Sequence, residues 1–177
     1  MADNNTDNNT DKDNRFFLKE CFTNIFIGDK KSVEKKSQIP ILTNLAISKI
    51  INVAADHVFI DKTSFESNGI LVTDIRVEDT DDFPISEYFD QTNQIINETL
   101  RDGKKVLVVC AGGISRSCTI VLAYLIAFEN YYNVIEALNK LRESRPFFNP
   151  NDGFKKQLEV YAKQQRTKKL FCNHISN

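Results

Sequence analysis

The sequence predicts an α/β domain with a central, mostly parallel sheet of about five strands flanked by helices. Three observations support this fold class. Runs rich in Ile and Val alternate along the chain with segments of helical periodicity. In residues 104–110 (KKVLVVC), two lysines are followed by a continuous apolar run, which is typical of a parallel strand covered on both faces. The chain has 177 residues, of which 41% are hydrophobic, so one sizeable core in one domain is expected.

The chain divides into a polar start, one folded domain and a polar end. Residues 1–14 hold five Asn and four Asp. They carry too little apolar surface to offset the entropy of ordering the chain, so we expect this tail to be disordered. Residues 15–166 are expected to form the folded domain, and residues 167–177 a polar C-terminal tail.

The first half of the domain shows short apolar runs separated by turn residues. These runs predict four segments. They are a strand or hairpin over residues 15–29, a helical segment interrupted by Pro40 over residues 32–47, a buried strand over residues 48–54 and, after a turn at Asn68 and Gly69, a strand over residues 70–77.

The second half has clear helix boundaries. Pro84 suits the start of a helix and Gly103 its end, so a helix is predicted from about Pro84 to Asp102. After the central strand, residues 116–130 are apolar nearly all round, which predicts a helix buried in the core. Two more helices follow, one with Val134, Leu138 and Leu141 on one side and one with a stripe of Phe154, Leu158 and Tyr161.

The central strand leads into a loop with the features of an anion site. The stretch VVCAGGISRS, residues 108–117, turns through Gly112 and Gly113 before the buried helix. The N–H groups of such a loop and the positive end of the helix dipole attract an anion. Arg116 can bind two oxygens of a phosphate at once, and the same positive surroundings favour the thiolate of Cys110. A nucleophile inside an anion site indicates transfer of a phosphoryl group to sulfur.

A proton donor for the leaving oxygen is expected on a neighbouring loop. Residues 76–83 (RVEDTDDF) follow a predicted strand, and parallel strands end at the same edge of a sheet. Asp79, Asp81 and Asp82 are therefore all candidates for a general acid. Asp79 is the closest to the end of the strand, whereas Asp82 is well placed to cap the following helix.

Four segments together resemble the dual-specificity protein phosphatases of the cysteine-dependent phosphatase superfamily, over roughly residues 15–165. They are CAGGISRS, EDTDDFPISEYF, IINVA and SRPFFNPNDGFKKQLEVY. The family signature resembles H-C-x-x-G-x-x-R-S/T, and this chain matches it at Cys110, Gly113, Arg116 and Ser117. The resemblance implies the cysteine phosphatase fold in a small, catalytic-domain-only enzyme that needs no metal and no cofactor.

The resemblance also implies a role for each matching residue. Cys110 is expected to form a phosphocysteine intermediate, Arg116 to grip the phosphate and Ser117 to help the thiolate leave. The family's acid segment selects Asp79 as the general acid. The element R-P-x-x-x-P-N-x-x-F is expected to brace the fold through Pro146, Pro150, Asn151 and Phe154. The residues expected to bind the substrate phosphate are Ala111, Gly112, Gly113, Ile114, Ser115 and Arg116.

One position departs from the family pattern, which usually has His immediately before the nucleophile. This chain has Val109 there. An apolar side chain cannot supply the buried hydrogen bonds that support a thiolate, so we expect an active enzyme in which Cys110 ionises less readily. The alternative is a phosphoprotein-binding pseudophosphatase with weak or no turnover.

Other site classes fit these residues less well. A papain-like thiol hydrolase needs a histidine base, and neither His57 nor His174 has an evident route to Cys110. A nucleotide-binding P-loop would carry Gly-Lys-Ser/Thr after its glycines, which GGISRS lacks. Low-molecular-weight phosphatases place their acid far downstream of the cysteine, and lipid phosphatases usually carry lysines inside the loop.

Composition bounds the partners and the setting. The 23 Lys and Arg nearly balance the 24 Asp and Glu, which argues against non-specific nucleic-acid binding. The longest apolar stretch, around residues 118–128, is too short to span a bilayer. The four cysteines form neither a zinc spacing nor a disulfide framework, so a reducing, intracellular setting is expected, in the cytoplasm and also in the nucleus. The expected partners are phosphorylated proteins. The basic segment after Asn151 is either a surface for an acidic partner or a solvated helix face.

Overall fold

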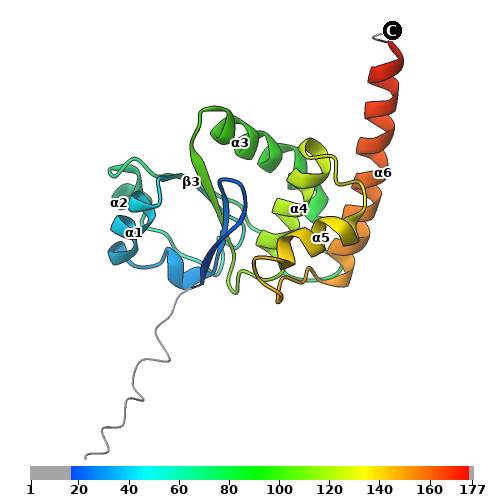
Figure 1. Cartoon of the computed structure of the whole chain (residues 1–177). Coiled ribbons are helices and arrows are strands. Elements are labelled where there is room, and N and C mark those ends of the chain that lie inside the picture. Colours follow the sequence, from blue (N-terminus) through cyan, green and yellow to red (C-terminus); the bar gives the residue numbers. More distant parts are fainter. Residues whose placement is uncertain (1–16, 176–177) are drawn as a thin grey trace, which may run out of the picture.

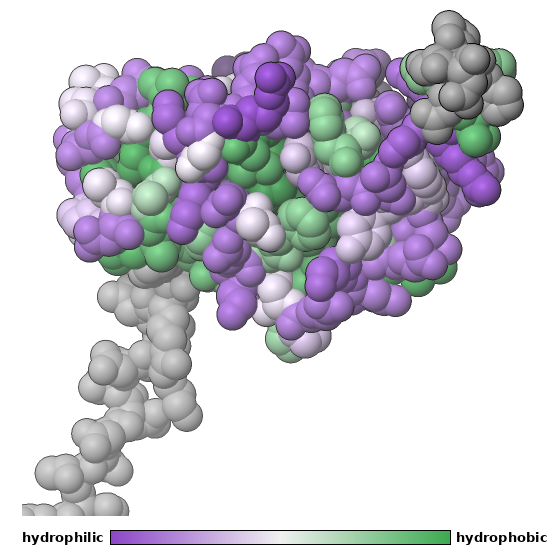
Figure 2. Space-filling view, turned by 45° about the horizontal axis from the view of Figure 1, so that its top comes forward, coloured by the Kyte–Doolittle hydropathy of each residue, from purple (hydrophilic) through white to green (hydrophobic). Residues whose placement is uncertain are grey.

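A computed structural model of the chain describes residues 17–175 (Figure 1). The tail expected to be disordered, residues 1–14, lies outside these described residues. Hydrophilic residues dominate the surface in Figure 2, and apolar residues are exposed in patches between them.

The predicted α/β architecture is confirmed. A five-stranded sheet has the order β1-β2-β5-β3-β4. Only β1 is antiparallel to its neighbour β2, and the other pairs are parallel. The apolar run at residues 104–110 supplies the central strand, as expected. The strands are β1 (Leu18–Phe22), β2 (Ile25–Gly28), β3 (Ile47–Asn52), β4 (Leu71–Asp74) and β5 (Lys105–Val109).

Helices cover both faces of the sheet. In Figure 1, the short α-helices lie on one side of the sheet and the longer ones on the other. The α-helices are α1 (Ile39–Asn44), α2 (Lys62–Glu66), α3 (Phe89–Arg101), α4 (Arg116–Phe128), α5 (Val134–Arg142) and α6 (Asp152–Ile175). Short 3-10 helices are η1 (Lys30–Ser32), η2 (Lys36–Gln38) and η3 (Ile85–Tyr88).

Helix α4 forms the centre of the helical layer, as its apolar sequence predicts. Every residue from Arg116 to Ile126 is buried. The helix contacts α3, α5 and α6 on its outer sides, and β2 and β5 on the side facing the sheet. This packing fixes the N-terminal end of α4 beside the carboxyl end of β5, where the functional loop lies.

Three details differ from the expected elements. Pro40 lies in the first turn of α1 and does not interrupt a longer helix, because the first turn needs no N–H donor from it. The helix expected from Pro84 begins as η3 and continues as α3 from Phe89. Asp82 does not cap it, since Pro84 occupies the N-cap position and no side chain bonds to that end.

Helix α6 extends beyond the expected domain end at residue 166 and runs to Ile175. Residues 167–175, which were expected to belong to a polar tail, thus continue the helix; among them Lys168, Lys169 and Leu170 have high helix propensity. Within residues 17–175, no helix is both long enough and apolar enough to cross a membrane.

Candidate active site

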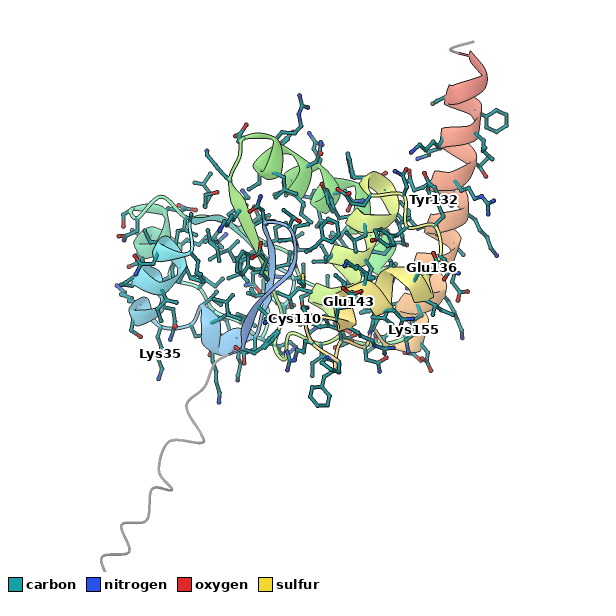
Figure 3. All side chains as sticks on the ribbon, viewed as in Figure 1. Lys35, Cys110, Tyr132, Glu136, Glu143 and Lys155 are labelled. Carbon is teal, nitrogen blue, oxygen red and sulfur yellow. The ribbon has the colours of Figure 1, made fainter. Side chains whose placement is uncertain are left out.

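The site is built on the loop that joins β5 to α4, residues 110–116, which we call the phosphate loop. Cys110 follows the last residue of β5 and is only 1% exposed. Its Sγ lies 3.2 Å from the Oγ of Ser117, in the first turn of α4. Figure 3 shows Cys110 inside the fold, at the carboxyl end of the sheet. The thiol is therefore held in one place with a hydroxyl beside it.

Of the two loop glycines, only Gly113 has a backbone conformation and surroundings that exclude a side chain. Gly113 has a φ of +63°, and a Cβ there would approach the carbonyl oxygen of Gly28 and the ring of Phe17, each to 2.9 Å. A Cβ at Gly112 would meet only the side chain of Ile114, at 3.7 Å, which is ordinary contact. The tight curl of the loop thus depends on Gly113.

Arg116 is buried and presents an unused donor. Its Nη1 donates to the carbonyl oxygen of Val77 at 3.0 Å, which fixes the guanidinium beneath the acidic loop. Its Nε is buried, has no hydrogen-bond partner among the described residues and lies 3.6 Å from Oδ2 of Asp79. A buried N–H left without a partner is costly. A bound oxyanion would satisfy it, as expected of the residue that grips a phosphate.

The structure brings one of the three candidate acids to the loop. Oδ1 of Asp79 accepts hydrogen bonds from Oγ of Ser115, at 2.7 Å, and from Nδ2 of Asn151, at 3.0 Å. Asp81 and Asp82 are exposed and make no side-chain hydrogen bond or ion pair within residues 17–175. Asp79 is thus the carboxylate that faces Cys110's loop, as the family pattern implied.

Asn151 does more than the bracing role expected from the sequence. Besides contacting Asp79, its backbone N–H donates to Oγ of Ser115 at 3.1 Å, and its Oδ1 accepts from the N–H of Phe154 at 2.8 Å. It therefore links the acid, the phosphate loop and the start of α6. Phe154 and Pro150 are buried as a brace requires, whereas Pro146 is exposed.

Arg145 is a second cation beside the loop that the sequence did not single out. Its guanidinium carbon lies 3.4 Å from the ring centroid of Phe17, and its Nη1 donates to the carbonyl oxygen of Gly113 at 3.3 Å. Burial lowers the pKa of Arg145. Phe17 lies 128 positions before Arg145 and Gly113 lies 32 before it, so the sequence does not show these contacts, although Arg145 is the first residue of the element R-P-x-x-x-P-N-x-x-F.

Comparison with known proteins decides the family. The family model of the dual specificity phosphatase catalytic domain matches residues 25–164. The chain belongs to this family. Dual specificity protein phosphatase 13B of Mus musculus is 32% identical over 152 residues, which cover 84% of this chain and 74% of that protein. MAP kinase phosphatase with leucine-rich repeats protein 3 of Dictyostelium discoideum is 36% identical over 89% of this chain, which spans only 17% of that protein's length.

Solved structures agree with this assignment to the dual specificity phosphatases. The crystal structure of the Yvh1 phosphatase domain from Chaetomium thermophilum is 27% identical and superposes with a TM-score of 0.72, covering 84% of this chain and 96% of that one. The human tyrosine phosphatase-like serine/threonine/tyrosine-interacting protein is 28% identical, with a TM-score of 0.73 and coverage of 81% and 94%.

The unusual residue of this dual specificity phosphatase, Val109, is fully buried at the end of β5. It pairs with Gly28 of β2 and Asn52 of β3, and its carbonyl oxygen accepts from the N–H of Val53 at 2.9 Å. The backbone of Val109 is hydrogen-bonded within the sheet, whereas its side chain has no polar atom that could bond to the thiol of Cys110.

The other described cysteines have surroundings unlike those of a nucleophile. Burial raises the pKa of the Cys21 thiol to about 12 and that of Cys118 well above its usual range. Cys118 is fully buried in α4, where it packs in the core. Cys172 is exposed on α6.

Proposed function

We propose that the chain hydrolyses phosphotyrosine and phosphoserine or phosphothreonine in proteins through a phosphocysteine intermediate on Cys110. One observation carries the proposal. Cys110 with Ser117, the unsatisfied Nε of Arg116 and the carboxylate of Asp79 meet around the phosphate loop. This set supplies a nucleophile, an anion clamp and a proton donor, which together suffice for transfer of a phosphoryl group.

In the first step, the thiolate of Cys110 attacks phosphorus, and the S–P bond forms as the bond to the leaving oxygen breaks. Arg116 and the loop N–H groups hold the oxygens of the transferring group. Asp79 gives its proton to the leaving oxygen. Both donors to this carboxylate bind Oδ1, which leaves Oδ2, 3.6 Å from Nε of Arg116, to carry the proton.

In the second step, water attacks the phosphorus of the phosphocysteine while Asp79 accepts a proton from that water. The S–P bond breaks and inorganic phosphate leaves. Ser117 lies 3.2 Å from the sulfur and can donate a hydrogen bond to the departing thiolate. The cycle requires a reduced thiol, which supports the proposal of a cytoplasmic or nuclear setting.

Turnover of para-nitrophenyl phosphate and of peptides phosphorylated on both Thr and Tyr tests this function. We expect Cys110→Ser to lower kcat by at least about a thousandfold, because the nucleophile is lost. Asp79→Ala should lower kcat on the peptides by about a hundredfold, the typical contribution of a general acid. Rapid acid quenching of the wild type should trap a phosphoryl group on the peptide that contains Cys110.

Asp81→Ala is the matched control, since this exposed carboxylate lies two positions further along the same loop. It should keep wild-type turnover. Binding of the phosphopeptides without turnover by the wild type would refute the enzyme and support the pseudophosphatase alternative.

A further inference from the structure

Two exposed apolar side chains beside the phosphate loop have no part in the proposed reaction. Ile114, within the loop, is 38% exposed, and Phe147, on the connection between α5 and α6, is 73% exposed. We call this pair the apolar rim. Single exposed apolar residues are common on proteins, so exposure alone indicates nothing. Phe147 differs from other exposed apolar residues because its segment is bonded to the phosphate loop and its backbone is held in place.

Hydrogen bonds on both sides of Phe147 attach its segment to the phosphate loop. Before it, Nη1 of Arg145 donates to the carbonyl oxygen of Gly113 at 3.3 Å. After it, the N–H of Asn149 donates to the carbonyl oxygen of Ile114 at 3.1 Å. Figure 1 shows the α5–α6 connection beside the loop that enters α4. Phe147 therefore lies along the part of the loop that contains Ile114.

The neighbours of Phe147 hold it in the outward position. Phe148 is fully buried, with its ring edge-on to that of Phe17 at 6.1 Å between centroids. Nε of Arg142 donates to the carbonyl oxygen of Phe148 at 2.9 Å. Since Phe148 faces inward in this fixed backbone, Phe147 cannot turn into the core. The backbone at Phe147 is therefore ordered before a partner binds, so covering its side chain requires no ordering of the main chain.

We propose that the apolar rim binds an apolar side chain close to the phosphorylated residue of a protein substrate. This proposal rests on the proposed function. An extended peptide advances ~3.4 Å per residue, so side chains within about three positions lie no more than ~10 Å from the phosphorylated one. Ile114 is part of the loop that holds the phosphate and the segment of Phe147 is bonded to that loop, so a peptide bound there can pass beside the rim. Polar flanking side chains gain little on such a surface, whereas an apolar one is removed from water.

Kinetics on a series of phosphotyrosine peptides test this inference. The parent peptide has polar residues throughout, and each variant carries one leucine at one of the three positions on either side of the phosphotyrosine. For at least one position, the wild type should show kcat/KM about tenfold higher than for the parent, the effect expected of partial burial of such a side chain. Phe147→Ser should reduce this advantage to less than about threefold.

Phe171→Ser is the matched control, because Phe171 is 67% exposed on α6. It should retain the leucine preference. Neither substitution should change turnover of para-nitrophenyl phosphate, which has no flanking residues. An equal rate for all peptides, or a preference that survives Phe147→Ser, overturns the inference while leaving the phosphatase function intact.

Binding separates this inference from a failure of catalysis. The same peptides can be titrated against Cys110→Ser by fluorescence anisotropy, which requires no turnover. The leucine preference should appear in Kd and be lost in the double variant Cys110→Ser, Phe147→Ser. Absence of a preference in Kd refutes the apolar rim even if the wild type proves inactive.

Discussion

Val109 is the residue at which this chain differs most consequentially from the pattern of its family. It is fully buried directly before Cys110, and its neighbours across the sheet are Gly28 and Asn52. A histidine at this position could donate hydrogen bonds that support the thiolate, and valine cannot. The hydroxyl of Ser117 lies beside the thiol, with its Oγ 3.2 Å from Sγ of Cys110.

Val109→His should therefore favour the thiolate of Cys110. The acidic limb of the kcat/KM profile should then move to lower pH. The measurement is a pair of pH–rate profiles on para-nitrophenyl phosphate, with thermal unfolding as a check that the larger side chain is accommodated. Acidic limbs at the same pH in both proteins would contradict this account.

At the scale of elements, the start of α6 is packed against the loop that carries the acid. A Cβ added to Gly153 would lie 1.8 Å from the carbonyl oxygen of Asp81, and would also overlap the Cα and carbonyl carbon of that residue. Two segments of backbone thus touch where no side chain fits. Because Asn151 lies in the same turn and holds Asp79, this contact sets the position of the acid as well as that of the helix.

Gly153→Ala should force the acid loop and α6 apart. We expect the free energy of unfolding to fall by ~1–3 kcal/mol, as for other overpacked sites. Turnover of phosphopeptides should fall as well, because Asp79 moves away from the leaving oxygen. Lys156→Ala, an exposed position on the same helix, is the control and should change neither quantity. Unchanged stability and turnover in Gly153→Ala would show that the packing is looser than described.

At the scale of the whole molecule, the fold gives its cysteines different reactivities. Cys21 and Cys118 lie in the core, where burial raises the pKa of both thiols, to about 12 for Cys21. Cys110 is also nearly inaccessible but lies in a loop that favours an anion. Cys172 lies at the surface of α6.

Alkylation with iodoacetamide at pH 7.5, followed by peptide mass mapping, should show this difference. In the native protein, Cys110 and Cys172 should be modified, whereas Cys21 and Cys118 should not, because a raised pKa keeps a thiol protonated and unreactive at this pH. Inorganic phosphate should protect Cys110 but not Cys172. All four should react in denaturant. Rapid labelling of Cys21 or Cys118 in the native protein would contradict the described core.

The features of this protein that can be predicted from its sequence are those encoded in short segments of the chain. The central strand and the buried helix were predicted because each has a strong local pattern. Cys110, Gly113, Arg116 and Ser117 were found together because they lie within eight consecutive positions of one loop and helix start. For Asp79, the residues alone left three candidates, and the family pattern selected among them.

The sequence by itself therefore determined the fold class, and it placed Cys110 and Arg116 in one loop between a strand and a helix. Only the tertiary structure decided what surrounds them. Asn151 donates a hydrogen bond to Asp79, which lies 72 positions earlier in the chain. The guanidinium of Arg145 lies over the ring of Phe17, which is also distant in sequence. Phe147 faces outward because Phe148 faces inward. The physical reason is that periodicity and turn residues act over a few positions, whereas these contacts arise when packing of the core brings distant segments together.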